Sequence, residues 1–168
     1  MKLQEARQQF ISSWGALGSQ WGINRTMAQI HALLLVSSGP VNADYIMTEL
    51  NLSRGNVNMN LHDLISWGLI EKTIIAGDRK DYFVAEKDIW KAAMTIAKQR
   101  KQRELDPMFK ILDQLTDLEE DPKDKEVKQF NETIAGIQSF AKQADRMLDG
   151  IIKADQHWFT GSLLKLFK

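Results

Sequence analysis

The chain has 168 residues, of which 43% are apolar, and carries no formal net charge. A chain of this length buries roughly two-thirds of its unfolded surface, so one domain, or one domain with an extension, is expected. Cysteine is absent, which excludes disulfides, thiolate metal sites and thiol nucleophiles. The longest apolar run, residues 32–36, is too short to cross a bilayer, and we expect a cytoplasmic protein with no membrane partner.

Four helices are predicted in the first part of the chain. The first covers residues 2–17, and Asn24 is a preferred N-cap for a second helix that ends before a Gly-Pro pair. Asn42 is an N-cap for a short helix over residues 43–50, and Ser53 is an N-cap for the fourth.

Two strands are predicted after the fourth helix, because β-branched and aromatic residues fill residues 69–76 and 81–85. The Gly-Asp-Arg-Lys segment between them is a usable hairpin turn and makes the tip basic. Helix, helix, short helix, helix and hairpin is the order of a winged helix-turn-helix, in which the fourth helix enters the DNA major groove.

The rest of the chain is predicted to be helical. One helix covers residues 86–104, a second follows a break at Asp106-Pro107 and extends to residue 118, and the acidic segment 119–124 interrupts the chain again. Charge also differs along the chain: residues 1–103 hold 13 Lys and Arg against 9 Asp and Glu, and residues 104–168 hold 9 against 13. This asymmetry favours a basic working part joined to an acidic part.

A heptad stripe follows the acidic segment, with apolar residues at alternating spacings of three and four. It is formed by Val127, Phe130, Ile134, Ile137, Ala141, Ala144, Leu148 and Ile151. Phe140 and Met147 widen the apolar face, which favours packing in a bundle. We interpret this segment as a dimerisation helix, with an intramolecular core helix as the alternative, and expect residues 157–168 to dock on the same bundle.

The fourth helix contains three asparagines within five residues, although Asn is a poor helix former. At 100° per residue, its apolar side chains share one face that is expected to contact the core; these are Val57, Leu61, Leu64 and Ile65. A helix that had only to be soluble would carry Glu, Lys and Ala on its other surface. This surface instead offers side chains that donate and accept hydrogen bonds.

Asn side chains pair with adenine, and Arg side chains pair with guanine or with phosphate. We therefore predict a DNA-binding surface made of Ser53, Arg54, Gly55, Asn56, Asn58, Met59, Asn60, His62, Arg79 and Lys80. Asn60 lies nearest the buried edge, so bracing the helix or holding a phosphate is its alternative role.

At the hairpin tip, Arg79 and Lys80 are predicted to contact phosphate or the minor groove, with Asp78 or Asp81 holding Arg79 in place. The alternative is a solvated turn with local ion pairs. A second basic run, from Lys98 to Arg103, is interpreted as a solvated helix face in preference to further phosphate contacts.

The run LSRGNVNMNLHDLISWGLI and the following GDRKDYFVAEKDIWK resemble the GbsR/MarR class of bacterial winged helix-turn-helix transcriptional regulators. In that class a GNVSMNL-like recognition helix and a G-x-RKD-x-Y-x-x-E-x-D-x-W-like wing are distinctive, and the second string is the more specific. The resemblance covers about residues 21–91. It implies a homodimer that binds an inverted-repeat operator, with N- and C-terminal helices at the dimer interface.

The expected fold is mainly α with a small β-hairpin: a winged helix-turn-helix domain and a C-terminal helical dimerisation region. Residues 1–20 are assigned to an N-terminal helix that contributes to dimerisation, 21–90 to the DNA-binding domain, and 91–168 to a dimerisation and effector region.

The three histidines are scattered and none has a partner at ligand spacing, so we predict no metal, no cofactor and no catalysis. Trp14, Trp21 and Trp90 are hypothesised to line a pocket for an organic cation between the DNA-binding lobe and the dimer helices, with core packing as the alternative. The predicted function is a homodimeric regulator that binds double-stranded DNA and responds to a small molecule. The alternative is a protein-interaction module built on a winged-helix fold and the heptad helix.

Overall fold

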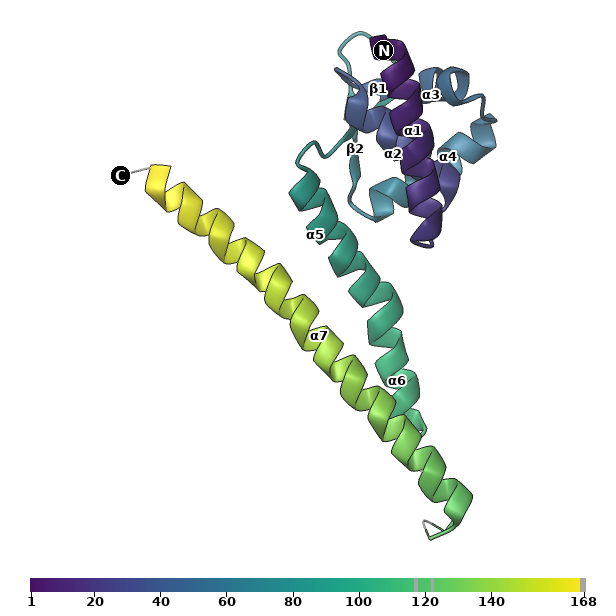
Figure 1. Cartoon of the computed structure of the whole chain (residues 1–168). Helices are drawn as coiled ribbons and strands as arrows, with labels where there is room; N and C mark the ends of the chain where they lie inside the picture. Colours follow the sequence, from purple (N-terminus) through teal and green to yellow (C-terminus); the bar gives the residue numbers. More distant parts are fainter. Residues whose placement is uncertain (117, 122, 167–168) are drawn as a thin grey trace. The chain divides into compact units, whose positions relative to one another are not determined.

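The computed structural model describes residues 1–116, 118–121 and 123–166, and of residues 154–166 it describes the backbone alone. The chain divides into two compact units, Met1–Thr95 and Ile96–Lys168 (Figure 1). The predicted docking of residues 157–168 on a bundle lies outside the described side chains. None of the helices in the described part of the chain combines the length and the apolar character that a bilayer crossing requires.

The first unit begins with four helices. They are α1 (Leu3–Gln20), α2 (Arg25–Val36), α3 (Ala43–Leu50) and α4 (Arg54–Ser66). The three predicted N-caps are confirmed, because each side-chain oxygen accepts a backbone N–H of the first turn. The Oδ1 atoms of Asn24 and Asn42 accept at 2.9 to 3.1 Å, and the Oγ atom of Ser53 accepts at 3.3 Å.

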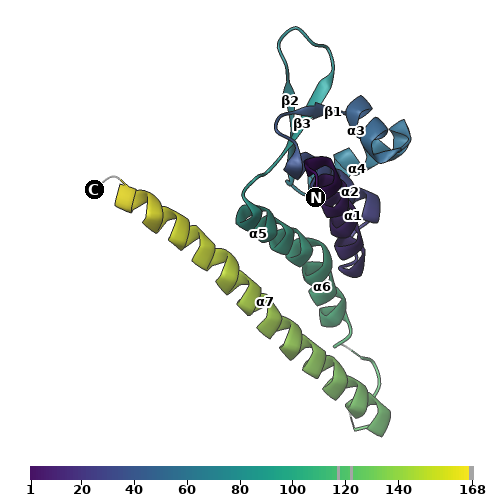
Figure 2. The same ribbon diagram turned by 45° about the horizontal axis from the view of Figure 1, so that its top comes forward.

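A three-stranded antiparallel sheet completes this unit, in the order β1 (Val41–Asn42), β3 (Asp81–Ala85) and β2 (Ile70–Ile74). The hairpin of β2 and β3 is the predicted wing, and it extends away from the helices (Figure 2). Strand β1 lies beside β3, with Asn42 opposite Tyr82. The sequence did not predict β1, because two residues are too few to show a strand pattern.

The core of the first unit lies around α2, which packs against α1, α3, α4 and β3. Its fully buried side chains come from three helices and include Ile30, Leu33, Leu34, Ile46, Val57 and Leu64. Of the predicted inner face of α4, Val57, Leu61 and Leu64 are buried, but Ile65 is 40% exposed. The prediction for Ile65 is wrong because the buried face of α4 is centred between Asn60 and Leu61, which puts Ile65 at its edge.

Helices α1 and α2 approach closely at two glycines of α1. A Cβ atom added to Gly18 would lie 2.6 Å from the Cβ atom of Ala28, and one added to Gly15 would lie 2.6 Å from the Cγ atom of Gln29. The Gly18 contact is the stricter of the two, because the Cβ atom of Ala28 is fixed to the backbone of α2. Any side chain at Gly18 would therefore force the two helices apart.

Two features connect α4 and the wing to the rest of the unit. Gly68, with φ of 73°, ends α4 in a Schellman motif, in which Gly68 donates to the carbonyl of Ile65 and Leu69 to that of Leu64. After the wing, the Nζ atom of Lys87 donates at 2.7 to 2.9 Å to three carbonyls at the C-terminal end of α2. A cation is favourable at this end of a helix, although burial lowers the pKa of Lys87.

The second unit contains the end of α5 (Ile89–Arg100), a π-helical turn (Lys101–Leu105) and α6 (Asp106–Gln114). These three segments follow one another without a gap (Figure 1). The predicted break at Asp106-Pro107 is therefore wrong. Proline lacks an N–H and crowds the carbonyl four residues before it, and the wider π-helical turn relieves both problems without ending the helix.

The long helix α7 (Lys125–Leu166) begins where the acidic segment ends, as predicted. The Oδ1 atom of Asp124 caps it by accepting the N–H groups of Glu126 and Val127 at 2.7 and 3.3 Å. Its heptad stripe is divided between two environments. Ile134 and Ala141 are buried within the unit, whereas Phe130, Ile137 and Ile151 are at least 40% exposed. Phe140 and Met147, which widen the stripe, are 73% and 61% exposed.

Candidate nucleic-acid interface

The surface of α4 opposite the core is polar and open. Arg54, Gly55, Asn58 and His62 are exposed, and Met59 is 57% exposed. Because Gly55 carries no side chain, it leaves open space beside the first turn of the helix. This arrangement lets a ligand approach the N-terminal end of α4, where backbone N–H groups and Arg54 would meet a negative charge.

Asn60 differs from the other predicted DNA-binding residues, because only 1% of it is exposed. Its Nδ2 atom donates to the backbone oxygen and to the Oδ1 atom of Asn56, at 2.8 and 2.7 Å. Asn60 therefore does not lie on the open surface of α4, and its alternative role as a brace fits the geometry. The brace also fixes the amide of Asn56, which is half-buried at the edge of that surface.

The tip of the wing is held by Asp78. Its Oδ1 atom accepts the backbone N–H of Lys80 at 2.9 Å, and its Oδ2 atom accepts the hydroxyl of Tyr82 at 2.7 Å. These hydrogen bonds, the one from Tyr82 first, lower the pKa of Asp78. Asp81 instead pairs with Lys72 at 2.9 Å.

The Asp78 carboxylate interacts with the backbone of Arg79 as well as with that of Lys80, whereas the side-chain partner of Asp81 is Lys72. The prediction that one of the two carboxylates holds Arg79 in place therefore fits Asp78 and not Asp81. Arg79 is exposed and forms no ion pair within the described part of the chain. The wing thus presents one unpaired guanidinium on a turn whose backbone is fixed by hydrogen bonds.

A single carboxylate joins α4 to the wing. Asp44 of α3 pairs through Oδ1 with Arg54 at 2.9 Å and through Oδ2 with Lys80 at 3.0 Å. The hydrogen bond and charge of Lys80, followed by the charge of Arg54, hold the pKa of Asp44 below its usual value, and Asp44 raises the pKa of Lys80. The sequence did not predict a role for Asp44, because no pattern along α3 marks this residue. Its position beside the wing follows from the pairing of β1 with β3, which is visible only in the structure.

The second basic run lies in a different environment. Lys101 is only 19% exposed, and its Nζ atom lies 2.8 Å from Asp145 and 3.4 Å from Asp149 on α7. It therefore holds α7 within the second unit. Arg100 pairs with Glu104 at 3.5 Å, and the Nε atom of Arg103 donates to Gln99 at 3.0 Å. The interpretation of this run as a solvated helix face is therefore wrong for Lys101, whereas Arg100 and Arg103 make contacts along their own helix.

The three tryptophans proposed for an effector pocket lie in different environments. Trp14 is half-buried, and its ring centroid is 5.4 Å from that of Phe10 and 6.5 Å from that of His31. Trp21 and Trp90 are 63% and 54% exposed. Core packing therefore explains Trp14, and none of the three lines a described cavity of the first unit.

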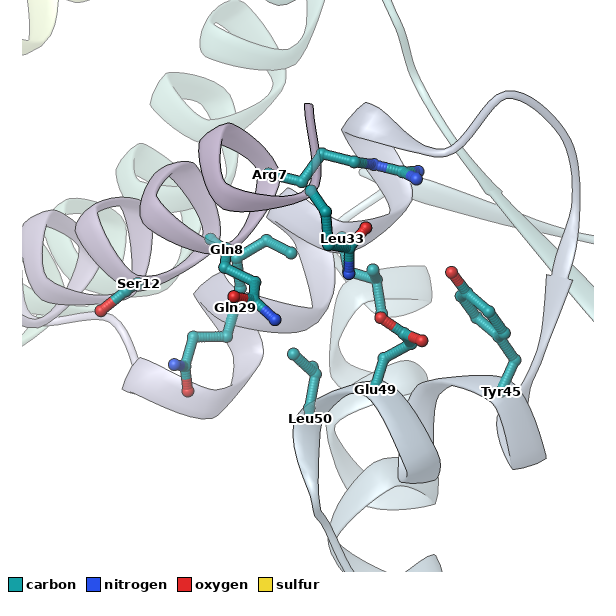
Figure 3. Close-up of a pocket in the computed structure, with 10 residues that line it drawn as sticks. Arg7, Gln8, Ser12, Gln29, Leu33, Tyr45, Glu49 and Leu50 are labelled. Carbon is teal, nitrogen blue, oxygen red and sulfur yellow. The ribbon is translucent and has the colours of Figure 1, made fainter. Parts of the chain in front are cut away.

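The first unit does contain a cavity of about 210 Å³ among α1, α2 and α3 (Figure 3). Its polar lining includes Arg7, Gln8, Gln29, Tyr45 and Glu49. The guanidinium of Arg7 already has a hydrogen-bond partner within the protein, because it donates to the carbonyl of Val36 at 2.9 Å. This volume is below the range that is usual for drug-sized ligands.

His31 lies inside the first unit, 4% exposed, with its Nε2 atom unpartnered among the described residues. Burial, and to a smaller extent the charge of Lys87, lowers the pKa of His31 to about 4. It is therefore neutral at pH 7. His62 is exposed on α4, and no group of three metal-ligating side chains occurs among the described residues.

Comparisons with known proteins give a match to one family model and similarity to solved structures. Residues 21–81 match the model of the MarR family. A crystal structure described as that of a transcriptional regulator is similar to this chain with a TM-score of 0.56 and 17% identity, over 86% of this chain and 99% of that one. A structure of a mutant of S. aureus MepR bound to an oligodeoxyribonucleotide has a TM-score of 0.41 and 16% identity, over 82% and 91% of the two chains.

No curated protein matches the chain. The first structural similarity concerns the fold, and with the three-stranded sheet and C-terminal helices it confirms the predicted fold class. The family match covers the segment that contains α2, α3, α4 and the wing.

Proposed function

We propose that the protein is a MarR-type transcriptional regulator that binds double-stranded DNA by sequence, as a homodimer on an inverted-repeat operator. The main observation behind the proposal is that α4 has a buried apolar face and an exposed polar face. Val57, Leu61 and Leu64 hold its inner face in the core, while its outer face is polar and open beside a basic wing tip. The match of residues 21–81 to the MarR family supports the same function.

In this proposal α4 enters the major groove, and its exposed polar side chains meet base edges. Asn56 and Asn58 supply paired donors and acceptors for adenine, and Arg54 meets guanine or phosphate. Arg79 at the wing tip adds a contact to the DNA backbone or the minor groove. Asn60 acts through Asn56, whose amide it orients.

The exposed apolar side chains of α7 support the homodimer. Phe140 is 73% exposed and Met147 is 61% exposed. Residues 130, 137, 140, 147 and 151 follow a heptad pattern on a face that the described part of the second unit leaves exposed. A helix face of this kind is stabilised when it packs against an identical face of a second copy.

The function is tested by selecting binding sequences for the full-length protein from a randomised pool of DNA duplexes. We expect one selected duplex with two half-sites about one helical turn, or a multiple of it, apart. Affinity for this duplex, measured by fluorescence anisotropy against a shuffled duplex, is expected to exceed affinity for the shuffled one by about 10³-fold or more and to fall steeply with salt. Binding without sequence preference would leave the protein-interaction module as the better assignment.

Variants of α4 and the wing are expected to act differently on the two duplexes. Asn56→Ala removes a base contact, so discrimination at the affected bases should fall by about 1–3 kcal/mol. Arg79→Ala removes a phosphate contact, so binding to both duplexes should weaken alike and the salt dependence should decrease by about one unit. Equal losses on both duplexes for Asn56→Ala would contradict base reading by α4.

The homodimer is tested by sedimentation of the full-length protein and of Phe140→Glu. A charged side chain on the uncovered face of α7 is expected to shift the protein from dimer to monomer at micromolar concentration. Lys142→Glu introduces a carboxylate at an exposed position of the same helix outside the heptad pattern and is the matched control. A Phe140→Glu variant that stays dimeric would place the interface elsewhere.

The three tryptophans give no support to a response to a small molecule, since they line neither of two described cavities of the first unit, of about 210 and 390 Å³. Such a response is tested by titrating the protein with small organic cations while Trp fluorescence and DNA affinity are followed. A change in both supports an effector, and a change in neither argues against one.

A further inference from the structure

Asp44 contacts two cations of the predicted DNA-binding surface, Arg54 and Lys80. One of its oxygens pairs with Arg54 at the start of α4, and the other pairs with Lys80 at the wing tip. Asp44 belongs to neither element, because it lies in the first turn of α3. One carboxylate thus neutralises two cations that come from the two DNA-facing parts of the domain.

The backbone fixes this arrangement. Strand β1 pairs with β3 so that Asn42 lies opposite Tyr82, and α3 begins directly after Asn42. The first turn of α3, which carries Asp44, therefore starts beside the strand that follows Lys80. Asn42 also caps α3 by accepting the N–H of Tyr45 at 2.9 Å. On the other side, Asp78 fixes Lys80 by accepting its backbone N–H. Both partners of the pair are therefore positioned by the fold and not by the ion pair alone.

The two ion pairs are open to solvent. The side chains of Asp44, Lys80 and Arg54 are 45%, 54% and 69% exposed. Exposed pairs are weak, because water and salt compete with them. A DNA phosphate can therefore replace Asp44 as the partner of either cation, but the carboxylate stays nearby and repels that phosphate.

This competition affects two classes of DNA unequally. Binding to non-cognate DNA depends almost wholly on phosphate contacts, whereas binding to an operator adds base contacts made by α4. A carboxylate that weakens phosphate contacts therefore removes a larger share of the non-cognate binding. On an operator, the base contacts hold α4 in place and Arg54 is directed at its specific partner.

Resting on the proposed function, we propose that Asp44 is a specificity-determining residue, which opposes binding of Arg54 and Lys80 to DNA of the wrong sequence. It touches no base in this role. It acts by its charge on two side chains that contact DNA, and its removal should increase affinity while lowering discrimination.

The experiment compares wild type, Asp44→Asn and Asp44→Glu on the selected duplex and on the shuffled duplex at several salt concentrations. For Asp44→Asn we expect affinity for the shuffled duplex to rise roughly threefold to tenfold, with a smaller rise on the selected duplex. Its binding to the shuffled duplex should also depend more steeply on salt, by about one unit of the log–log slope. Asp44→Glu keeps the charge and is expected to return most of the discrimination.

Glu49→Gln is the matched control, because Glu49 lies on the same helix, is exposed and forms no ion pair among the described residues. It removes an identical charge and should leave discrimination unchanged. A second test places Asp44→Asn in a Lys80→Gln background, where the gain on shuffled DNA is expected to shrink. Thermal melting of each variant checks that the fold is retained.

The outcomes separate the two proposals. If wild type does not distinguish the selected from the shuffled duplex, the proposed function fails, and the role of Asp44 fails with it. If wild type distinguishes them but Asp44→Asn gains equally on both, loses affinity on both, or does not change, only the role of Asp44 is overturned. An equal effect of Glu49→Gln would also overturn it, because the effect would then come from net charge alone.

Discussion

The two units use their apolar side chains in opposite ways. In the first unit, Ile30, Ile46 and Val57 have no exposed surface and lie among four helices and a sheet. In the described part of the second unit, Leu112, Ile134 and Ala141 are the buried apolar side chains, while Phe140 and Met147 are mostly exposed. The first unit therefore has a complete core, whereas the second leaves an apolar face uncovered among its described residues, which is the kind of surface that marks an interaction site.

The ionic clusters of the two units also differ. Lys101 is 19% exposed and lies within 4 Å of three carboxylates, so in the second unit an ionic cluster holds helices together. Asp44 in the first unit is at the surface and pairs with two cations that we propose to contact DNA. The cluster around Lys101 thus joins helices, and the one around Asp44 is the one that we propose to limit binding.

The largest expected effect tests the contrast between the two cores. Leu64→Ala removes a side chain that is 1% exposed, so we expect the free energy of unfolding to fall by about 3–4 kcal/mol in urea titrations. Phe140→Ala, at a side chain that is 73% exposed, is expected to change it by less than about 0.5 kcal/mol in dilute monomer. Similar losses for both variants would contradict the contrast.

The second effect is acid destabilisation of the first unit through His31. Its folded pKa of about 4 is below the value of 6.5 for an unperturbed histidine, so the neutral form contributes stability above pH 6.5. That contribution is lost as the pH falls from 6.5 through 4 and amounts to about 3 kcal/mol. Urea unfolding at several pH values should show it.

His31→Gln is the control, because it removes the titration and keeps a polar side chain of similar size. The variant should lose markedly less stability than wild type between pH 6.5 and pH 4.5. The idea is rejected if both proteins lose the same amount over this interval.

A smaller effect is expected at the brace of α4. Asn60→Ala removes two buried hydrogen bonds to Asn56, which should lower the free energy of unfolding by about 1–2 kcal/mol. Asn58→Ala, two residues earlier and exposed, should leave stability within about 0.5 kcal/mol. Both variants are expected to lose DNA discrimination, so stability and discrimination separate the brace from the base contact.

The smallest effect is expected in the second unit. Lys101→Met leaves Asp145 and Asp149 without their cation and should cost about 1 kcal/mol. Amide hydrogen exchange in α7 is the measurement, since the loss of the ionic cluster should increase exchange around residues 141–149. Lys142→Met, at an exposed position of α7, should leave exchange unchanged. Equal exchange in both variants would show that the cluster does not hold α7.

Local features of the fold could be predicted from the sequence. The N-caps Asn24, Asn42 and Ser53 act within three residues of themselves, so the chain alone reveals them. The inner face of α4 was also predictable, because Val57, Leu61 and Leu64 repeat at helical spacing. The exact centre of that face was not, since it depends on which neighbours cover Asn60.

Features that join distant segments could not be predicted. Strand β1 exists only because it pairs with β3, and the ion pair of Asp44 with Lys80 joins α3 to the wing beside that pairing. Lys101 is a second example, because the sequence predicted it as part of a basic helix face although its partners lie on α7. Of the proposed surface, the polar character of α4 was visible in the sequence, and the charge that opposes it was not.

The contact between Gly18 and Ala28 has a mechanical consequence. No flexible side chain separates α1 from α2 at this point, so little compression is available there before backbone and Cβ atoms collide. A force applied to α1 is therefore passed to α2, which packs in turn against α3, α4 and β3. A displacement of α1 is therefore expected to move α2 and, through α2, the helix α4 that packs against it.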